Sequence, residues 1–166
     1  MVNRDDMLLL IDYNYWATAR VLGAAQRALE GERDLRASIY WQAILRAMIH
    51  TMSAEWLWRV RCQESESPRK GLDPRDYPTL EALRTRWQEE EQAMRAYVAG
   101  LNDAQLSGTV RYANTKGVEF ERVLWQILAH VVNHGTQHRA EAALLLTEMG
   151  YSSGDVDLIY FLAERN

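Results

Sequence analysis

The sequence predicts an all-α fold, a four-helix bundle with a short fifth helix at the C-terminus. Four long segments carry apolar residues at spacings of three and four, which places them on one face of a helix. The 166 residues include only nine Gly and three Pro, too few for an all-β fold with many tight turns. An apolar fraction of 48% and a charged fraction of 25% are typical of an ordinary globular domain. We therefore expect one domain over residues 1–166.

The first two helices are expected in the N-terminal part of the chain. Residues 4–29 have the helical apolar spacing, and Gly31 stands just beyond them, where a helix often stops. Residues 38–62 form the second expected helix, for which Ser38 is a plausible N-cap. All three prolines follow within residues 63–79, which we expect to be a surface loop. So long a connection permits a topology other than simple up-and-down.

The third helix is expected to begin at Thr79 and to end at Gly100. Glu81 lies in its first turn, where a carboxylate interacts favourably with the helix dipole. After this helix, residues 106–120 alternate in polarity around the turn-forming residues 114–117, so we expect a short β-hairpin or a loop there.

The fourth helix is expected over residues 121–149 and stops at Gly150, and a last short helix covers residues 155–164. Four amphipathic helices with apolar stripes facing inward bury those stripes by packing as a bundle. The fifth helix then serves as a lid or a support.

Composition excludes several classes of protein. A single cysteine, Cys62, rules out an intramolecular disulfide framework and a thiolate zinc cluster, and it fits a reducing cytoplasm. The sequence has no signal-peptide pattern and no stretch of ~20 apolar residues that would span a membrane. The net charge is -4, with 19 basic residues scattered among 23 acidic ones, unlike the concentrated basic surface of nucleic-acid binders. We expect a cytoplasmic protein without membrane or nucleic-acid partners.

All four histidines of the chain lie in two of the expected helices. His130, His134 and His138 are four residues apart, so their imidazoles share one helix face. One metal ion can bind an adjacent pair, but the outer two lie about 12 Å apart along the axis. His50 can supply a third ligand from a facing helix. A single core histidine is more often bonded to a carbonyl group than to a metal, and spacing alone leaves both interpretations and both adjacent pairs open.

Four segments in order along the chain resemble a known family: DYNYWATARVL, IHTMSAEWLWRV, HVVNHGTQHRAEAALLLTEMGY and DVDLIYFLAE. Together they are similar to the DinB-like family of small bacterial helical proteins. The resemblance implies a four-helix bundle with a further C-terminal helix, a homodimer, and a relation to thiol-dependent transferases and isomerases that carry a three-ligand metal site.

By position, the resemblance assigns the metal ligands to His50, His134 and His138. His130 then becomes a neighbour of the site. The family pattern often continues with glycine and glutamine after the arginine, whereas this chain has Ala140 and Glu141. The difference places a carboxylate near the site or its interface.

With this resemblance we expect a metal-dependent enzyme of the thiol-dependent transferase or isomerase type that acts on a small electrophilic substrate. One divalent ion, zinc or nickel, would polarise a thiol or water, and a low-molecular-weight thiol is a candidate cofactor. Arg20 and Arg139 are candidates to bind its carboxylate. The catalytic residues are not assigned. Candidates for the surroundings of the ligands are His130, Asn133, Glu55, Tyr13, Tyr15 and Arg139.

Two other hypotheses stay open. One is a non-catalytic metal- or ligand-binding stress-response module that acts as a homodimer, and the other is a structural dimer whose histidines have no ligand role. The tryptophans Trp16, Trp56, Trp58 and Trp125 fit core or interface packing better than a substrate cage.

Overall fold

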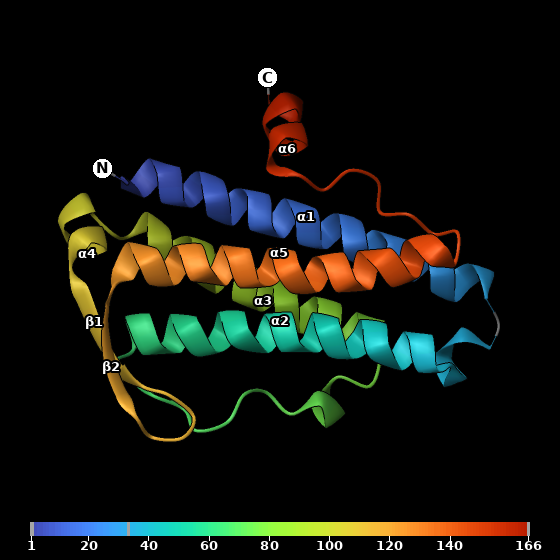
Figure 1. Ribbon diagram of the computed structural model, residues 1–166, viewed down its shortest axis with the longest axis horizontal. Coiled ribbons are helices and arrows are strands. Elements are labelled where there is room, and N and C mark those ends of the chain that lie inside the picture. The colour runs from blue at the N-terminus through green and yellow to red at the C-terminus, as the bar shows by residue number, and fades with distance from the viewer. Residues whose placement is uncertain (1, 33, 166) are drawn as a thin grey trace.

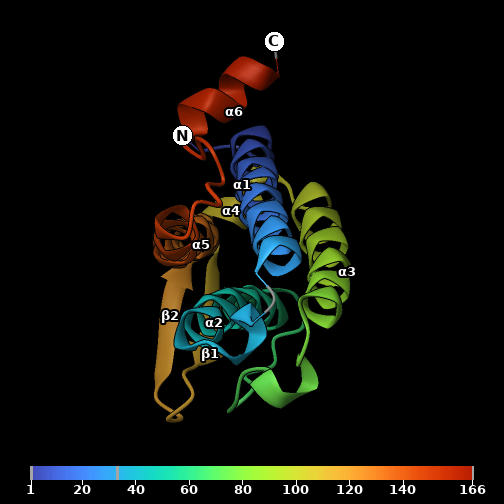
Figure 2. The ribbon, with the colours of Figure 1, turned by 90° about the vertical axis from the view of Figure 1, so that its right-hand side faces the viewer.

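The computed structural model describes residues 2–32 and 34–165. It confirms the predicted all-α bundle, whose long helices are α1 (Arg4–Gly31), α2 (Ile39–Gln63), α3 (Leu80–Ala99) and α5 (Leu124–Glu148). Viewed along the bundle, each long helix packs against two others, in the cyclic order α1, α3, α2, α5 (Figure 2). The shorter elements are the 3-10 turns Leu35–Ala37 and Pro74–Asp76, α4 (Asp103–Ser107), α6 (Leu158–Glu164), and the strands β1 (Thr109–Ala113) and β2 (Glu119–Val123).

The helices are not arranged simply up and down. Helices α1 and α5 run in one direction, and α2 and α3 run in the other (Figure 1). The connection between α2 and α3 therefore returns along the whole bundle. Two hydrogen bonds attach it: the Leu72 amide donates to the Ser53 hydroxyl of α2, and the Ala113 amide of β1 donates to the Ser67 hydroxyl, both at 2.9 Å. The long proline-rich connection thus determines that α2 and α5 lie side by side and antiparallel.

Capping side chains mark the N-termini of α1, α2, α3 and α4. The Ser38 hydroxyl accepts a hydrogen bond from the Trp41 amide, and the Thr79 hydroxyl caps α3 in the same way. Helix α1 runs two residues further than predicted and includes Gly31. A side chain at that position would overlap the Tyr151 hydroxyl, so this glycine serves close packing inside the last helical turn.

The predicted start of α5 at residue 121 was wrong, because the hairpin extends further. In the antiparallel register Arg111 lies opposite Glu121, and the two side chains form an ion pair at 3.3 Å. The Thr109 hydroxyl donates to the same carboxylate at 2.6 Å. These cross-strand contacts keep this segment extended, and the helix begins only at Leu124. Gly117, with a φ of +86°, allows the tight turn between the strands.

Two short helices differ from the sequence expectations. Helix α4 was not predicted; it is a single turn closed by a capping box between Asn102 and Gln105. Helix α6 begins at Leu158, three residues later than expected, and packs against α1.

Three of the four tryptophans predicted to pack in the core or at an interface do pack against the core: Trp16, Trp58 and Trp125. Trp41 and Trp87 are buried, at 3% and 2% exposure. Those predicted to pack in the core or at an interface are half-buried: Trp16, Trp56, Trp58 and Trp125. Their indole rings are therefore partly available at the surface.

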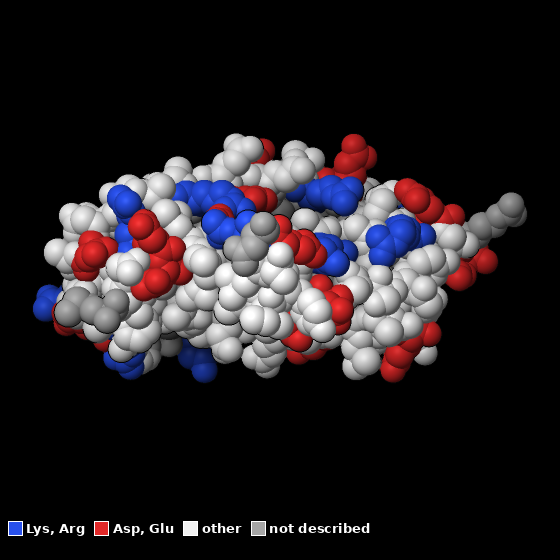
Figure 3. Space-filling model, turned by 90° about the horizontal axis from the view of Figure 1, so that it is seen from above, with Lys and Arg blue, Asp and Glu red and all other residues white. Residues whose placement is uncertain are grey.

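The molecular surface carries both signs of charge. On the face shown in Figure 3, basic and acidic side chains are intermixed. None of the helices over residues 2–32 and 34–165 is long and apolar enough to cross a membrane.

Candidate metal centre

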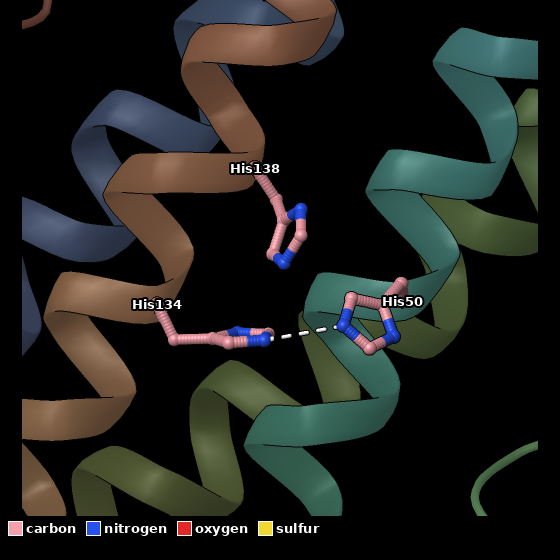
Figure 4. A group of neighbouring side chains, drawn as sticks. All are labelled: His50, His134 and His138. Carbon is pink, nitrogen blue, oxygen red and sulfur yellow. Dashed lines mark hydrogen bonds between the residues drawn. The ribbon is translucent and has the colours of Figure 1, made fainter.

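Three histidines from two helices converge on one point. His50 extends from α2, and His134 and His138 extend from successive turns of α5 (Figure 4). The ring nitrogens that would serve as ligand atoms all lie within 4.8 Å of one another. The Nε2 atoms of His134 and His50 are 3.2 Å apart. A spacing of four residues on α5 and the antiparallel neighbour α2 together produce this arrangement.

The cluster lies at the surface of the bundle and not in its core. His50 is exposed, although its sequence neighbours are apolar, and the other two rings are half-buried. The apolar residues beside His50 in sequence therefore do not enclose it in the core. Its helix buries Met48, Ile49 and Met52 on the other side. An exposed third ligand leaves the site open to small molecules.

A carboxylate fixes the orientation of one imidazole. His138 Nδ1 lies 2.8 Å from a carboxylate oxygen of Glu141, three residues further along α5. A carboxylate only accepts hydrogen bonds, so Nδ1 carries the proton and the Nε2 lone pair faces the other two rings. Glu141 is the carboxylate that the departure from the family pattern places near the site.

The surroundings favour neutral imidazoles. Partial burial, together with a smaller effect of the nearby His138, His50 and His130 rings, lowers the pKa of His134 to about 4. Burial also lowers the pKa of His50. Near pH 7 both rings are unprotonated, so their nitrogen lone pairs are free to bind a cation. Three imidazole nitrogen ligands suit zinc, nickel or another divalent ion that prefers imidazole, and they leave coordination positions for water or substrate.

His130 and Asn133 lie outside the cluster. The His130 ring is one helical turn away, 5.8 Å from the His134 ring and 5.6 Å from that of Trp58. Asn133 is exposed, and its side chain makes no hydrogen bond to the three histidines in the described part of the chain.

Other predicted neighbours form a separate network inside the bundle. Glu55 is 1% exposed and accepts hydrogen bonds from Asn14 Nδ2 at 2.8 Å and from Trp87 Nε1 at 2.7 Å. Arg139, also 1% exposed, donates to the Asn14 side-chain oxygen. The Arg139 guanidinium also lies over the ring of Tyr13, with 5.9 Å to the ring centroid. Within residues 2–32 and 34–165, none of these side chains hydrogen-bonds to the histidine cluster.

Neither arginine proposed for a thiol carboxylate is available. Arg139 points into the core although it follows a cluster histidine in sequence, because consecutive helical residues are about 100° apart. Arg20 instead pairs with Glu164 of α6 at 2.9 Å.

Sequence reasoning missed Asn14, the residue that joins Glu55 to Arg139. The sequence signal is a polar residue within the apolar stripe of the first helix.

Stability should depend on pH through Glu55. Burial raises the pKa of this carboxyl from 4.5 to about 7, more than its hydrogen-bond donors lower it. Between pH 4.5 and about pH 7, Glu55 is protonated in the folded protein but ionised in the unfolded chain. The stability that Glu55 contributes is therefore lost as the pH rises through 7. We expect the free energy of unfolding of the wild type, relative to Glu55→Gln, to fall by about 2 to 3 kcal/mol from pH 5 to pH 8. Urea unfolding at both pH values measures this, and a constant difference would contradict it.

Comparisons with known proteins give a consistent result. The sequence model that describes the DinB family matches residues 1–165 of the chain. Among curated proteins, Protein DinB of Bacillus subtilis (strain 168) is 23% identical over 170 residues, which covers 92% of this chain and 91% of that protein. No solved structure matches the chain.

Proposed function

Because the chain belongs to the DinB family, we propose that it binds one divalent metal ion, zinc or nickel, through His50, His134 and His138. We further propose that it is a metal-dependent enzyme of the thiol-dependent transferase or isomerase type. The observation that carries the proposal is the convergence of three imidazoles from two helices, with ligand atoms within 4.8 Å. Zinc sites in enzymes use three protein ligands and keep one coordination position open. The histidine cluster offers three ligands.

The ion, when bound, would lower the pKa of a coordinated thiol or water and so supply a nucleophile near neutral pH. The protein's own part is to hold the ligands and admit the substrate. Glu141 orients the His138 ring through Nδ1 and leaves Nε2 for the ion. The exposed position of His50 gives a small electrophile a path to the site.

Any thiol used in the reaction would come from outside the chain. Burial raises the pKa of the Cys62 thiol to about 12, so this cysteine stays protonated and is a poor nucleophile at neutral pH. This favours a low-molecular-weight thiol as cofactor. The cytoplasmic location and the homodimer are expectations that rest on the single cysteine and on the family resemblance.

The test begins with protein purified without a histidine tag and freed of metal. Titration with zinc or nickel should give one ion per chain, measured by elemental analysis after gel filtration. The loaded protein should then consume a low-molecular-weight thiol in the presence of small electrophiles, and the metal-free protein should not. Metal binding without turnover across such a panel would favour the non-catalytic module, and a stoichiometry near zero would refute the metal site.

A further inference from the structure

A cavity of about 240 Å³ opens between α2, α5 and the hairpin, beside the histidine cluster. The residues that line it are Trp58, Tyr112, Arg122, Gln126, Ile127 and His130. His130 connects the cavity to the cluster, because its ring is 5.8 Å from that of His134. A small molecule in this cavity would therefore lie next to the proposed metal centre.

Three rings form the wall of the cavity. The Trp58 ring meets Tyr112 at a centroid distance of 4.9 Å and an angle of 77°, and it meets His130 at 5.6 Å and 81°. Phe120 stacks on Tyr112 at 5.7 Å and Arg61 lies over Trp58, so each of these two rings has one covered face. The parts of the three rings that line the cavity form an aromatic wall, against which an aromatic guest can pack. The wall therefore favours an aromatic group over a flexible polar one.

Two arginines next to this wall have no acidic partner. Arg61 is 5% exposed, and its guanidinium carbon lies 4.7 Å from the Trp58 ring centroid and 5.6 Å from that of Tyr112. Its Nε is buried without a hydrogen-bond partner among the described residues. Arg122, which lines the cavity, donates to the Glu121 carbonyl oxygen, and within the same described residues neither arginine forms a salt bridge.

Arg61 is the buried charge of the two, whereas Arg122 is exposed and can pair with an anion that enters the cavity. A buried cation without a partner is costly, and a nearby negative charge offsets the cost. The larger cavity on the hairpin, about 610 Å³, contrasts with this one. Its Arg111 is already paired with Glu121. The excess positive charge is thus specific to the aromatic cavity beside the cluster.

We propose that this cavity is the substrate pocket of the metal centre and that it receives an aromatic carboxylate, whose ring lies against Trp58, Tyr112 and His130 and whose charge is balanced by Arg122 and Arg61. The inference rests on the proposed function, since it assigns a substrate class to the same site.

The test uses benzoate as the probe, with benzamide as the uncharged analogue and cyclohexanecarboxylate as the non-aromatic one. Binding is followed by NMR through the indole N–H signal of Trp58, assigned with Trp58→Phe. Benzoate should bind about tenfold more tightly than either analogue, the difference expected for one lost charge-assisted hydrogen bond or one lost aromatic contact. Equal affinities for the three probes would overturn the proposal.

The variants separate the pocket from the metal. Arg122→Gln changes an exposed side chain, so the variant should keep the fold. It should weaken the binding of benzoate about tenfold and leave the binding of benzamide unchanged. Arg61→Met, which preserves packing, should act in the same direction, and Arg36→Gln on the exposed 3-10 turn is the matched control without effect. Benzoate binding that is insensitive both to Arg122→Gln in the cavity and to Arg61→Met behind the Trp58 ring would overturn the proposal.

Zinc stoichiometry measured on the same samples distinguishes the two proposals. Benzoate binding that persists in His134→Ala would place the probe in the cavity. If benzoate instead binds only to the zinc-loaded protein and binds independently of Arg122, the probe ligates the ion, and that result would overturn the proposed pocket. One ion per chain with no benzoate binding would overturn the pocket alone. Benzoate binding without any zinc binding would overturn the proposed function and with it the assignment of the cavity as its substrate pocket.

Discussion

The His134→Ala variant should lose its metal ion, whereas His130→Ala should keep it. The three cluster rings form a triangle: the His134 centroid lies 5.0 Å from that of His50 and 4.5 Å from that of His138, which are 4.6 Å apart, and His134 Nε2 lies 3.2 Å from that of His50. Removing a ligand should cost more than the 10- to 100-fold typical of residues that only orient ligands. We therefore expect zinc affinity to fall by more than about 100-fold in His134→Ala.

The two variants make a matched pair, because they change the same residue type on neighbouring turns of α5. Competition with a chromophoric chelator at pH 7.5 measures both affinities, and circular dichroism checks that both remain helical. Loss of zinc in His130→Ala together with retention in His134→Ala would show that the other adjacent pair binds the ion.

The Arg139→Met variant should be destabilised by about 3 to 5 kcal/mol, the cost of removing one partner from a buried charged network. The guanidinium is 1% exposed and donates to Asn14 and, at 3.1 Å, to the Thr136 hydroxyl. Methionine fills much of the volume but leaves Asn14 without its donor, and it removes the Arg139 charge that lowers the pKa of Glu55. Urea unfolding at pH 7 measures the loss.

A double-mutant cycle tests the coupling within this network. The double variant Glu55→Gln with Arg139→Met should lose less stability than the two single changes added together, because the unpaired carboxylate is gone. Arg36→Met, a change at an exposed arginine, should stay within about 0.5 kcal/mol of the wild type. Strict additivity would show that Glu55 and Arg139 are independent.

The sequence predicted the long helices well because their signals are local. Apolar spacing, the caps Ser38 and Thr79 and the stop at Gly100 depend on residues a few positions apart. The start of α5 was missed because its determinant is not local: Glu121 pairs with Arg111 and Thr109 across the hairpin. Tertiary contacts of this kind override helical periodicity at the end of an element.

For the site, the sequence by itself determined that His134 and His138 share one helix face and that only His50 lies on another helix. It left open which adjacent pair acts and where His50 lies, because helical spacing fixes directions around one axis but not the distance to a second helix. The tertiary structure decided where His50 lies: beside His134 and His138. The return of the proline-rich connection makes α2 and α5 antiparallel neighbours, which brings His50 to His134 and His138 and Trp58 to His130. It also turned Arg139 and Glu55 into the core, since burial depends on which face of each helix the bundle covers.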